Sequence, residues 1–306
     1  MRTDISFPSR GLRCKGWLYL PDALEQGQRL PAIAMAHGFS AVKEMFLDRF
    51  AERFAAAGFA VLVFDFRFLG ESDGEPRGQI FPHEQLEDYR NAITWLSRRS
   101  EIDSERIGIW GTSYSGGHVL HLAAFDPRVK AAVAQVPAVG VWRQMLHGEG
   151  RAALRGLLAM LAMDRAARFE SGVVNYLKVV APPGEACVLA TPDAYEWFEK
   201  NAADLAPSWE NCVTLESLEH MIEYNAADAI ELISPTPLLV IAATEDSLVS
   251  IEVVQEAFER AGEPKELCLL ECGHFDVYAS EPWFAEAAGR AGAWFKAQLG
   301  STSRAV

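Results

Sequence analysis

The chain contains 306 residues, half of them hydrophobic, and its 42 Asp and Glu outnumber its 28 Lys and Arg to give a net charge of −14. A surface with this charge repels nucleic acid and anionic membranes, so we expect neither as a partner. The N-terminal sequence has no signal-peptide core and no run reaches the roughly 20 apolar residues of a membrane helix, which predicts a cytoplasmic protein.

Apolar runs alternate with helical segments along the first part of the chain. The predicted strands cover residues 12–20, 31–36, 59–64, 106–110 and 131–136. The predicted helices between them cover residues 43–57, 83–98 and 115–125. This alternation is typical of an α/β fold with a mostly parallel sheet and helices on both faces.

The alternation stops after Val136 and resumes at Pro237, with further strands at 237–243 and 266–271. We therefore predict a core domain formed by residues 1–136 and 237–306, and an inserted helical cap formed by residues 137–236, because an ordinary connection is far shorter.

The cap sequence is rich in large apolar side chains. Residues 152–163 are apolar on most sides, with Arg155 as their only charge. One interpretation is an apolar substrate pocket, for which the candidates are Trp142, Met145, Met160 and, from the core domain, Phe275. The alternative is a helix buried against the core domain or in the interface of a homodimer.

A sharp strand-to-helix turn at Gly111-Thr112-Ser113-Tyr114-Ser115 holds the first candidate catalytic residue. A nucleophilic serine on such a turn needs small residues two positions away on each side, and Gly111 and Ser115 meet this need. Ser115 departs from the glycine of the strict G-x-S-x-G pattern. The spacing predicts that Ser113 is a nucleophile.

A literal G-x-S-x-G occurs at Gly70-Glu71-Ser72-Asp73-Gly74. Its predicted strand ends several residues earlier, and the turn-forming residues after it cannot start a helix. We therefore prefer Ser113 over Ser72.

An acid and a histidine follow Ser113 in the order that a catalytic triad of this type requires, each after a predicted strand. Asp246 follows strand 237–243 and His274 follows strand 266–271. Glu245 and Asp276 are alternative acids. Of the other six histidines, two lie on the helix after Ser113 and so precede the acid, and three follow no predicted strand. The sixth, His37, belongs to a different turn.

The turn His37-Gly38-Phe39 follows strand 31–36 and is a candidate oxyanion hole. We expect the backbone N–H groups of Phe39 and Tyr114 to stabilise the developing negative charge. The alternative is a plain turn that ends a strand.

These motifs resemble those of α/β-hydrolases, in the same order along nearly the whole chain: the HGF turn, the segment DFRFLGES at residues 65–72, the elbow at Ser113, the Asp246 loop and the CGH loop at His274. The chain is most similar to bacterial esterases and thioesterases grouped with dienelactone hydrolases and with the hydrolase domain of X-Pro dipeptidyl peptidases. Dienelactone hydrolases use a cysteine nucleophile, so Ser113 argues against lactone hydrolysis. Haloalkane dehalogenases and epoxide hydrolases of this fold use an aspartate instead.

The predicted function is hydrolysis of a small-molecule carboxylic ester or thioester through an acyl-enzyme on Ser113, without a cofactor. One alternative is an acyltransferase or thioesterase of a biosynthetic pathway, and another is a catalytically silent ligand-binding protein. No metal is expected, since Cys268, Cys272 and His274 match no zinc spacing. The odd number of cysteines, five, indicates no disulfide framework.

Overall fold

The computed structural model describes residues 1–22 and 27–300, so residues 23–26 and 301–306 of the predicted core domain lie outside the described part. An eight-stranded sheet runs through the core in the order β1-β2-β4-β3-β5-β6-β9-β10. Strands β1 and β2 are antiparallel to their neighbours, and the pairs from β4 to β10 are parallel. The α/β prediction with a mostly parallel sheet is confirmed.

The eight strands have the following bounds: β1 Arg2–Ser9, β2 Leu12–Tyr19, β3 Leu30–Ala36, β4 Ala60–Phe64, β5 Ile102–Thr112, β6 Val129–Gln135, β9 Leu238–Ala243 and β10 Lys265–Leu270. Strands β3, β4 and β9 are buried along their whole length. Burial on both faces explains why these strands appear in the sequence as continuous apolar runs.

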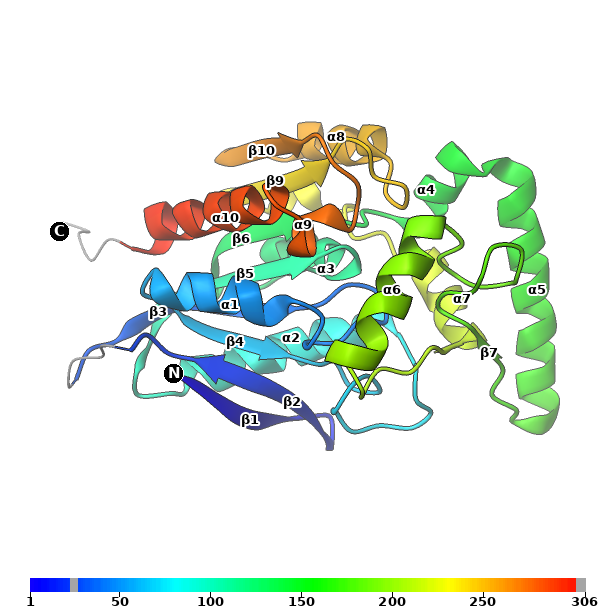
Figure 1. The fold of residues 1–306 in the computed structure, drawn as a ribbon, viewed down its shortest axis with the longest axis horizontal. Helices are drawn as coiled ribbons and strands as arrows, with labels where there is room; N and C mark the ends of the chain where they lie inside the picture. The colour runs from blue at the N-terminus through cyan, green and yellow to red at the C-terminus, as the bar shows by residue number, and fades with distance from the viewer. Residues whose placement is uncertain (23–26, 301–306) are drawn as a thin grey trace.

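Helices cover both faces of the sheet (Figure 1). Helices α1 (Leu47–Ala56) and α10 (Trp283–Leu299) share one apolar layer with the sheet, and α2 (Pro82–Ser97), α3 (Tyr114–Phe125) and α8 (Ile251–Arg260) share the other. Alternate residues of β3 divide between the two layers, with Ala34 in one and Met35 in the other. None of the helices in the described ranges combines the length and apolarity of a membrane span.

The segment between β6 and β9 corresponds to the predicted cap, and we use that name for it. It consists of helices α4 (Val141–Gly148), α5 (Gly150–Ser171), α6 (Pro192–Leu205) and α7 (Leu215–Glu223), the short 3₁₀ helix Ile230–Leu232, and a two-stranded sheet of β7 (Tyr176–Leu177) and β8 (Val213–Thr214). The small antiparallel sheet was not predicted. In Figure 1 the cap lies at the end of the sheet where β3 and β5 terminate, with α5 as its outermost element.

Candidate active site

Ser113 lies between the end of β5 and the first turn of α3. Its backbone has φ 56° and ψ −119°, a region that residues with a side chain adopt only under constraint. The constraint comes from two hydrogen bonds, because the Ser113 N–H donates to Gln135 O at 2.8 Å and its carbonyl accepts from Ala138 N–H at 2.9 Å. Both partners belong to β6 and the loop after it, so the neighbouring strand holds the turn.

The structure explains the two small residues around Ser113. A Cβ at Gly111 would lie 2.4 Å from the Ser115 carbonyl oxygen, which is far inside van der Waals contact. Ser115 is fully buried, and its hydroxyl lies 3.2 Å from the Tyr89 hydroxyl. The serine at this position therefore fits the space, and it explains why the turn does not need a second glycine.

The structure brings Ser113, His274 and Asp246 together. Ser113 Oγ lies 3.1 Å from His274 Nε2, and His274 Nδ1 lies 2.6 Å from Asp246 Oδ2. The second oxygen of Asp246 accepts the N–H groups of Leu248 at 2.8 Å and Val249 at 2.7 Å. His274 and Asp246 side chains are only 2% exposed, so this chain of contacts lies largely out of water.

The two alternative acids are placed elsewhere. Glu245 is exposed. Asp276 Oδ2 accepts the N–H of Gly273 at 2.9 Å and so shapes the loop that carries His274. The geometry therefore favours Asp246 as the partner of the histidine.

Ser72 is buried in a structural position. Its hydroxyl donates to the Asp65 carbonyl at 2.7 Å and accepts the Lys15 N–H at 2.8 Å. These bonds connect the loop after β4 to β2, and the described residues place no histidine against this hydroxyl. The literal G-x-S-x-G motif is thus a turn.

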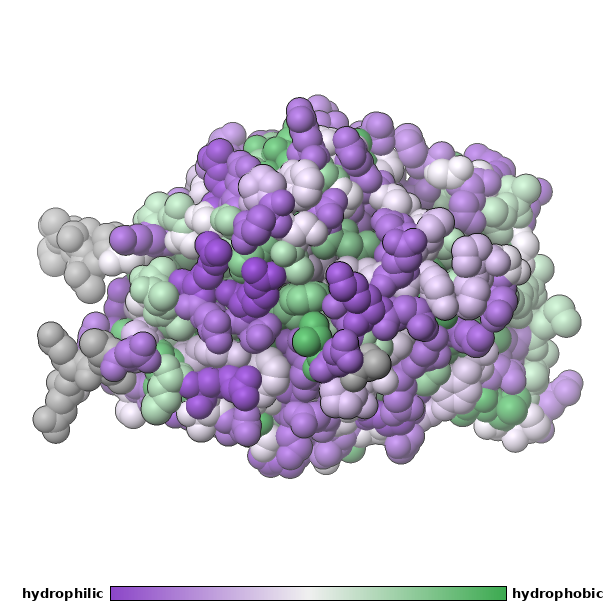
Figure 2. All heavy atoms as spheres, in the orientation of Figure 1, coloured by the Kyte–Doolittle hydropathy of each residue, from purple (hydrophilic) through white to green (hydrophobic). Residues whose placement is uncertain are grey.

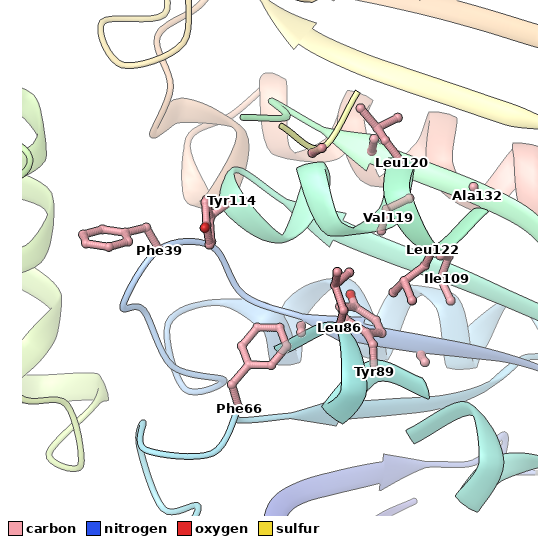
Figure 3. Close-up of a cluster of buried hydrophobic side chains, with 14 of the residues drawn as sticks. Phe39, Phe66, Leu86, Tyr89, Ile109, Tyr114, Val119, Leu120, Leu122 and Ala132 are labelled. Carbon is pink, nitrogen blue, oxygen red and sulfur yellow. The ribbon is translucent and has the colours of Figure 1, made fainter. Parts of the chain in front are cut away.

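The turn after β3 leaves one N–H group free beside Ser113. His37 Nε2–H donates to Met45 O at 2.9 Å, and its Nδ1 accepts the Gly38 N–H at 2.7 Å. Burial lowers the pKa of His37 to about 4, so the ring is neutral and can make both bonds. Within the described chain, the N–H groups of Phe39 and Tyr114 have no acceptor. Figure 3 shows these two residues next to each other at the ends of β3 and β5.

A cavity of about 840 Å³ lies between the core domain and the cap, and Ser113 and His274 are part of its wall. Its lining is mostly apolar and includes the predicted pocket residues Met145, Met160 and Phe275. Trp197 of α6 stacks on Phe275 with 5.0 Å between ring centroids, and both rings are part of the cavity wall.

The prediction that Trp142 lines the pocket is wrong. Helix α4 turns Val141, Gln144 and Met145 toward the cavity. Trp142 is one residue, or about 100° of helical rotation, away from Val141. Its ring packs instead under the Arg143 guanidinium, 4.6 Å from the ring centroid.

A buried lysine in the segment between β3 and α1 was not predicted. Lys43 Nζ lies 2.6 Å from Glu44, 2.8 Å from Asp65 and 2.7 Å from Glu71, and its side chain is fully buried. Burial opposes the charge on Lys43, but the neighbouring carboxylates outweigh it and raise the pKa above its usual value. In the described ranges these three acids are the only cluster spaced for a metal ion, and the ammonium already lies among them.

The chain matches the family described as X-Pro dipeptidyl-peptidase (S15 family) over residues 11–276. It is 31% identical to the quorum-quenching protein AidA of Acinetobacter baumannii (strain MDR-ZJ06), over 91% of this chain and 89% of AidA. It is 32% identical to the thiohydrolase apmlB of Arthrinium phaeospermum, over 87% of both chains.

A third relative has a solved structure. The polyketide transferase grgF of a Penicillium species is 31% identical over 90% of both chains. The crystal structure of the alpha/beta hydrolase GrgF from Penicillium sp. sh18 superposes with a TM-score of 0.83, covering 98% of this chain and 100% of that one at 27% identity. The resemblance seen in the sequence is confirmed: the chain belongs to the X-Pro dipeptidyl-peptidase (S15) family, and it is an enzyme of the α/β-hydrolase fold.

Proposed function

We propose that this enzyme cleaves a small-molecule carboxylic ester or thioester by forming an acyl-enzyme on Ser113. The observation that carries the proposal is the chain of contacts from Ser113 through His274 to Asp246, in the wall of an apolar cavity. A nucleophile in contact with a base, and a base oriented by a buried acid, is the arrangement that nucleophilic acyl transfer requires.

In the first half-reaction, Ser113 Oγ attacks the carbonyl carbon while His274 Nε2 takes the hydroxyl proton. The negative charge that develops on the substrate oxygen is stabilised by the N–H groups of Phe39 and Tyr114. His274 then gives its proton to the leaving alcohol or thiol, and the bond to that group breaks. Asp246 stabilises the charged imidazole, and its own orientation is set by the N–H groups of Leu248 and Val249.

In the second half-reaction, a water molecule loses a proton to His274 and attacks the acyl carbon on Ser113. The tetrahedral intermediate collapses, Ser113 recovers the proton from His274, and the carboxylic acid leaves. Each residue thus returns to its starting protonation state, and the cycle needs no cofactor.

The cavity supports an apolar acyl group as the substrate. Its wall includes aliphatic and thioether side chains from the cap, among them Leu157, Met160 and Met221. Flexible methionine walls adapt to apolar groups of different shape.

The cysteines support a cytoplasmic location for the enzyme. All five are unpaired, which fits a reducing cytoplasm.

A second candidate is transfer of the acyl group to an acceptor other than water. One observation favours it: the relative grgF is named a polyketide transferase. The first half-reaction is the same in both cases. Supplying an alcohol, thiol or amine and comparing transfer product with free acid distinguishes them.

The experiment that tests the nucleophile is intact-mass spectrometry after treatment with a fluorophosphonate, followed by peptide mapping. We expect one adduct on Ser113, which is lost in Ser113→Ala and strongly slowed in His274→Ala. The Ser72→Ala variant is the control and should label normally. Folded protein that forms no adduct would instead favour the silent ligand-binding protein.

A further inference from the structure

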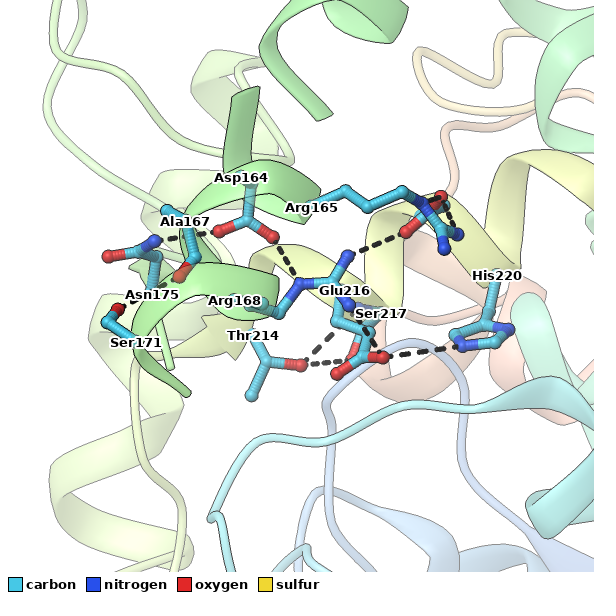
Figure 4. Close-up of polar contacts among 11 residues, drawn as sticks. Asp164, Arg165, Ala167, Arg168, Ser171, Asn175, Thr214, Glu216, Ser217 and His220 are labelled. Carbon is cyan, nitrogen blue, oxygen red and sulfur yellow. Dashed lines mark hydrogen bonds and ion pairs between the residues drawn. The ribbon is translucent and has the colours of Figure 1, made fainter. Parts of the chain in front are cut away.

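One part of the cavity wall is apolar, and ion pairs between two cap helices hold it in place. Helices α5 and α7 contribute side chains that include Leu157 and Met221. Arg168 of α5 pairs with Glu216 of α7 at 2.8 Å and with Glu219 at 2.7 Å (Figure 4). An apolar wall of this kind accommodates the hydrocarbon part of a substrate but offers it no hydrogen bond.

Another part of the wall is polar and lies where α4 and α6 meet the loop 246–250 after β9. Gln144 of α4 accepts the Ser250 N–H on its Oε1 at 2.8 Å. The Ser247 hydroxyl donates to Asp193 of α6 at 2.6 Å. Because this loop also carries Asp246, the polar groups of α4 and α6 are tied to the loop of the triad acid.

The side-chain amide of Gln144 has a fixed orientation. A backbone N–H can only donate, so the Ser250 N–H must face Oε1 of Gln144 and not its NH₂ group. The Nε2 atom then offers two N–H bonds, and it is buried without an acceptor among the described residues. A buried donor without a partner is costly, and nearly all such groups in native proteins have one.

Thr191 carries a second unpaired group of the cavity wall. It is the N-cap residue of α6, where a threonine hydroxyl normally accepts a backbone N–H, but this hydroxyl makes no such bond. Its Oγ1 is buried and has no partner in the described part of the chain. Figure 2 shows hydrophilic residues where α6 lies in Figure 1, and Glu196 and Glu199 of this helix are exposed. The Thr191 hydroxyl, in contrast, is out of contact with solvent.

Two further residues of the cavity wall have an unpaired polar atom, the Tyr114 hydroxyl and the Trp197 Nε1. Both lie in groups of aromatic rings. The ring centroids of Tyr114 and His118 are 4.8 Å apart, and those of Trp197 and Phe198 are 4.9 Å apart. A polar hydrogen can point at an aromatic face, so these two groups need no substrate oxygen.

We propose that the Gln144 amide donates a hydrogen bond to a substrate oxygen other than that of the reacting carbonyl, and that the Thr191 hydroxyl belongs to the same polar subsite. The enzyme then selects esters or thioesters that carry a second acceptor oxygen over plain alkyl ones. A site built to hydrogen-bond a substrate group rejects the analogue that lacks it, because the site's own polar atoms stay unpaired. This inference rests on the proposed function.

Three kinds of thioester test the preference, each assayed by release of its thiol. The octanoyl thioester of pentanethiol is the reference, without a second oxygen. Keto-octanoyl thioesters of pentanethiol, with the ketone beyond the β-carbon so that it does not activate the thioester, place the oxygen in the acyl group. The octanoyl thioester of N-acetylcysteamine places it in the leaving group at similar length. We expect kcat/KM of the wild type to be about tenfold or more higher for one of the oxygenated kinds.

Gln144→Glu is the decisive variant, because it keeps an oxygen for the Ser250 N–H and replaces the donor by an acceptor. Its new charge acts on every substrate, so the quantity compared is the ratio of kcat/KM between the oxygenated and the plain thioester. We expect this ratio to fall by about tenfold. Gln144→Met removes the amide without adding a charge and should lower the same ratio. Gln255→Glu on α8, outside the cavity wall, is the matched control and should keep the wild-type ratio.

Thr191→Val should lower the ratio by a smaller factor, and Thr191→Ser should keep it. An unchanged ratio in Thr191→Val removes this residue from the subsite. A wild-type enzyme that hydrolyses the plain thioester as fast as every oxygenated one overturns the inference, and so does a wild-type ratio in either folded Gln144 variant. Hydrolysis of none of the thioesters by the wild type would instead contradict the proposed function itself. Thermal unfolding of each variant shows whether it is folded.

Discussion

A Cβ atom at Gly38 would lie 2.6 Å from the Cβ of Ser113 and 3.0 Å from the Thr112 carbonyl oxygen. The turn after β3 therefore touches the nucleophile turn after β5 at a distance that only glycine permits. This contact places the Phe39 N–H beside Ser113, as the Tyr114 N–H is, although Phe39 and Tyr114 are far apart in sequence.

We expect Gly38→Ala to lower kcat by about 10²–10³-fold, the effect of losing one oxyanion donor, because the added methyl group pushes Phe39 away from Ser113. Gly289→Ala is the control, since a Cβ there meets no atom within 4 Å, and it should keep full activity. Steady-state kinetics on a chromogenic ester measures both. Normal kcat in Gly38→Ala would remove Phe39 from the oxyanion hole.

Asp246→Asn should lower kcat by about 10⁴-fold, as in other Ser-His-Asp triads, because the amide favours the wrong tautomer of His274. Glu245→Gln is a matched change on the adjacent exposed residue and should have no effect. A large loss in Glu245→Gln with normal turnover in Asp246→Asn would transfer the role to Glu245. The comparison uses kcat at saturating substrate.

Lys43→Met should destabilise the protein by about 3–5 kcal/mol, because it leaves the buried Asp65 carboxylate without its counter-charge. Lys130→Met is the control: its ion pair with Glu105 spans 3.8 Å at the surface and should contribute at most about 1 kcal/mol. Urea unfolding measures both changes. A chelator should leave the unfolding midpoint of the wild type unchanged, because the Lys43 ammonium occupies the space among the acids.

Stability should fall as the pH is lowered from about 6.5, the ordinary pKa of histidine. Burial lowers the pKa of His118 to about 3, and it lowers those of His37 and His121 to about 4. Between these values and about 6.5 the unfolded chain binds more protons than the folded one, so acid favours unfolding.

Urea unfolding at several pH values measures this slope. His118→Asn should flatten this slope, because it removes the buried imidazole. An unchanged slope in His118→Asn would mean that this imidazole is protonated in the folded state.

Leu157→Trp should shift the preferred acyl chain to shorter lengths, because Leu157 lines the cavity and the indole would fill part of it. A difference of one methylene in an apolar pocket is worth about 1–3 kcal/mol, or about 10–200-fold in kcat/KM. Leu158→Trp, on the next residue and 45% exposed, is the control. An equal length profile for both variants would place the acyl group elsewhere in the site.

The sequence alone was sufficient to predict strands β3 to β6, β9 and β10. It also selected Ser113, Asp246 and His274, which the structure brings into contact. Parallel strands buried on both faces need continuous apolar runs, and a nucleophile turn needs small neighbours, so both leave a local pattern. Strand β1 was missed because most of its residues are exposed or half-buried at the edge of the sheet. An edge strand of this kind has no apolar run to identify it.

Only the tertiary structure decided which side chains line the cavity and which charges are buried. Both depend on contacts between distant residues and on helix rotation. The rotation of α4 turned Trp142 away from the cavity and Gln144 toward it. The burial of Lys43 among three acids needed the loops after β3 and β4 to meet. The apolar sequence at residues 152–163 left open a cavity wall or a buried helix, and only the folded position of α5 shows that one side lines the cavity while Met163 is 76% exposed.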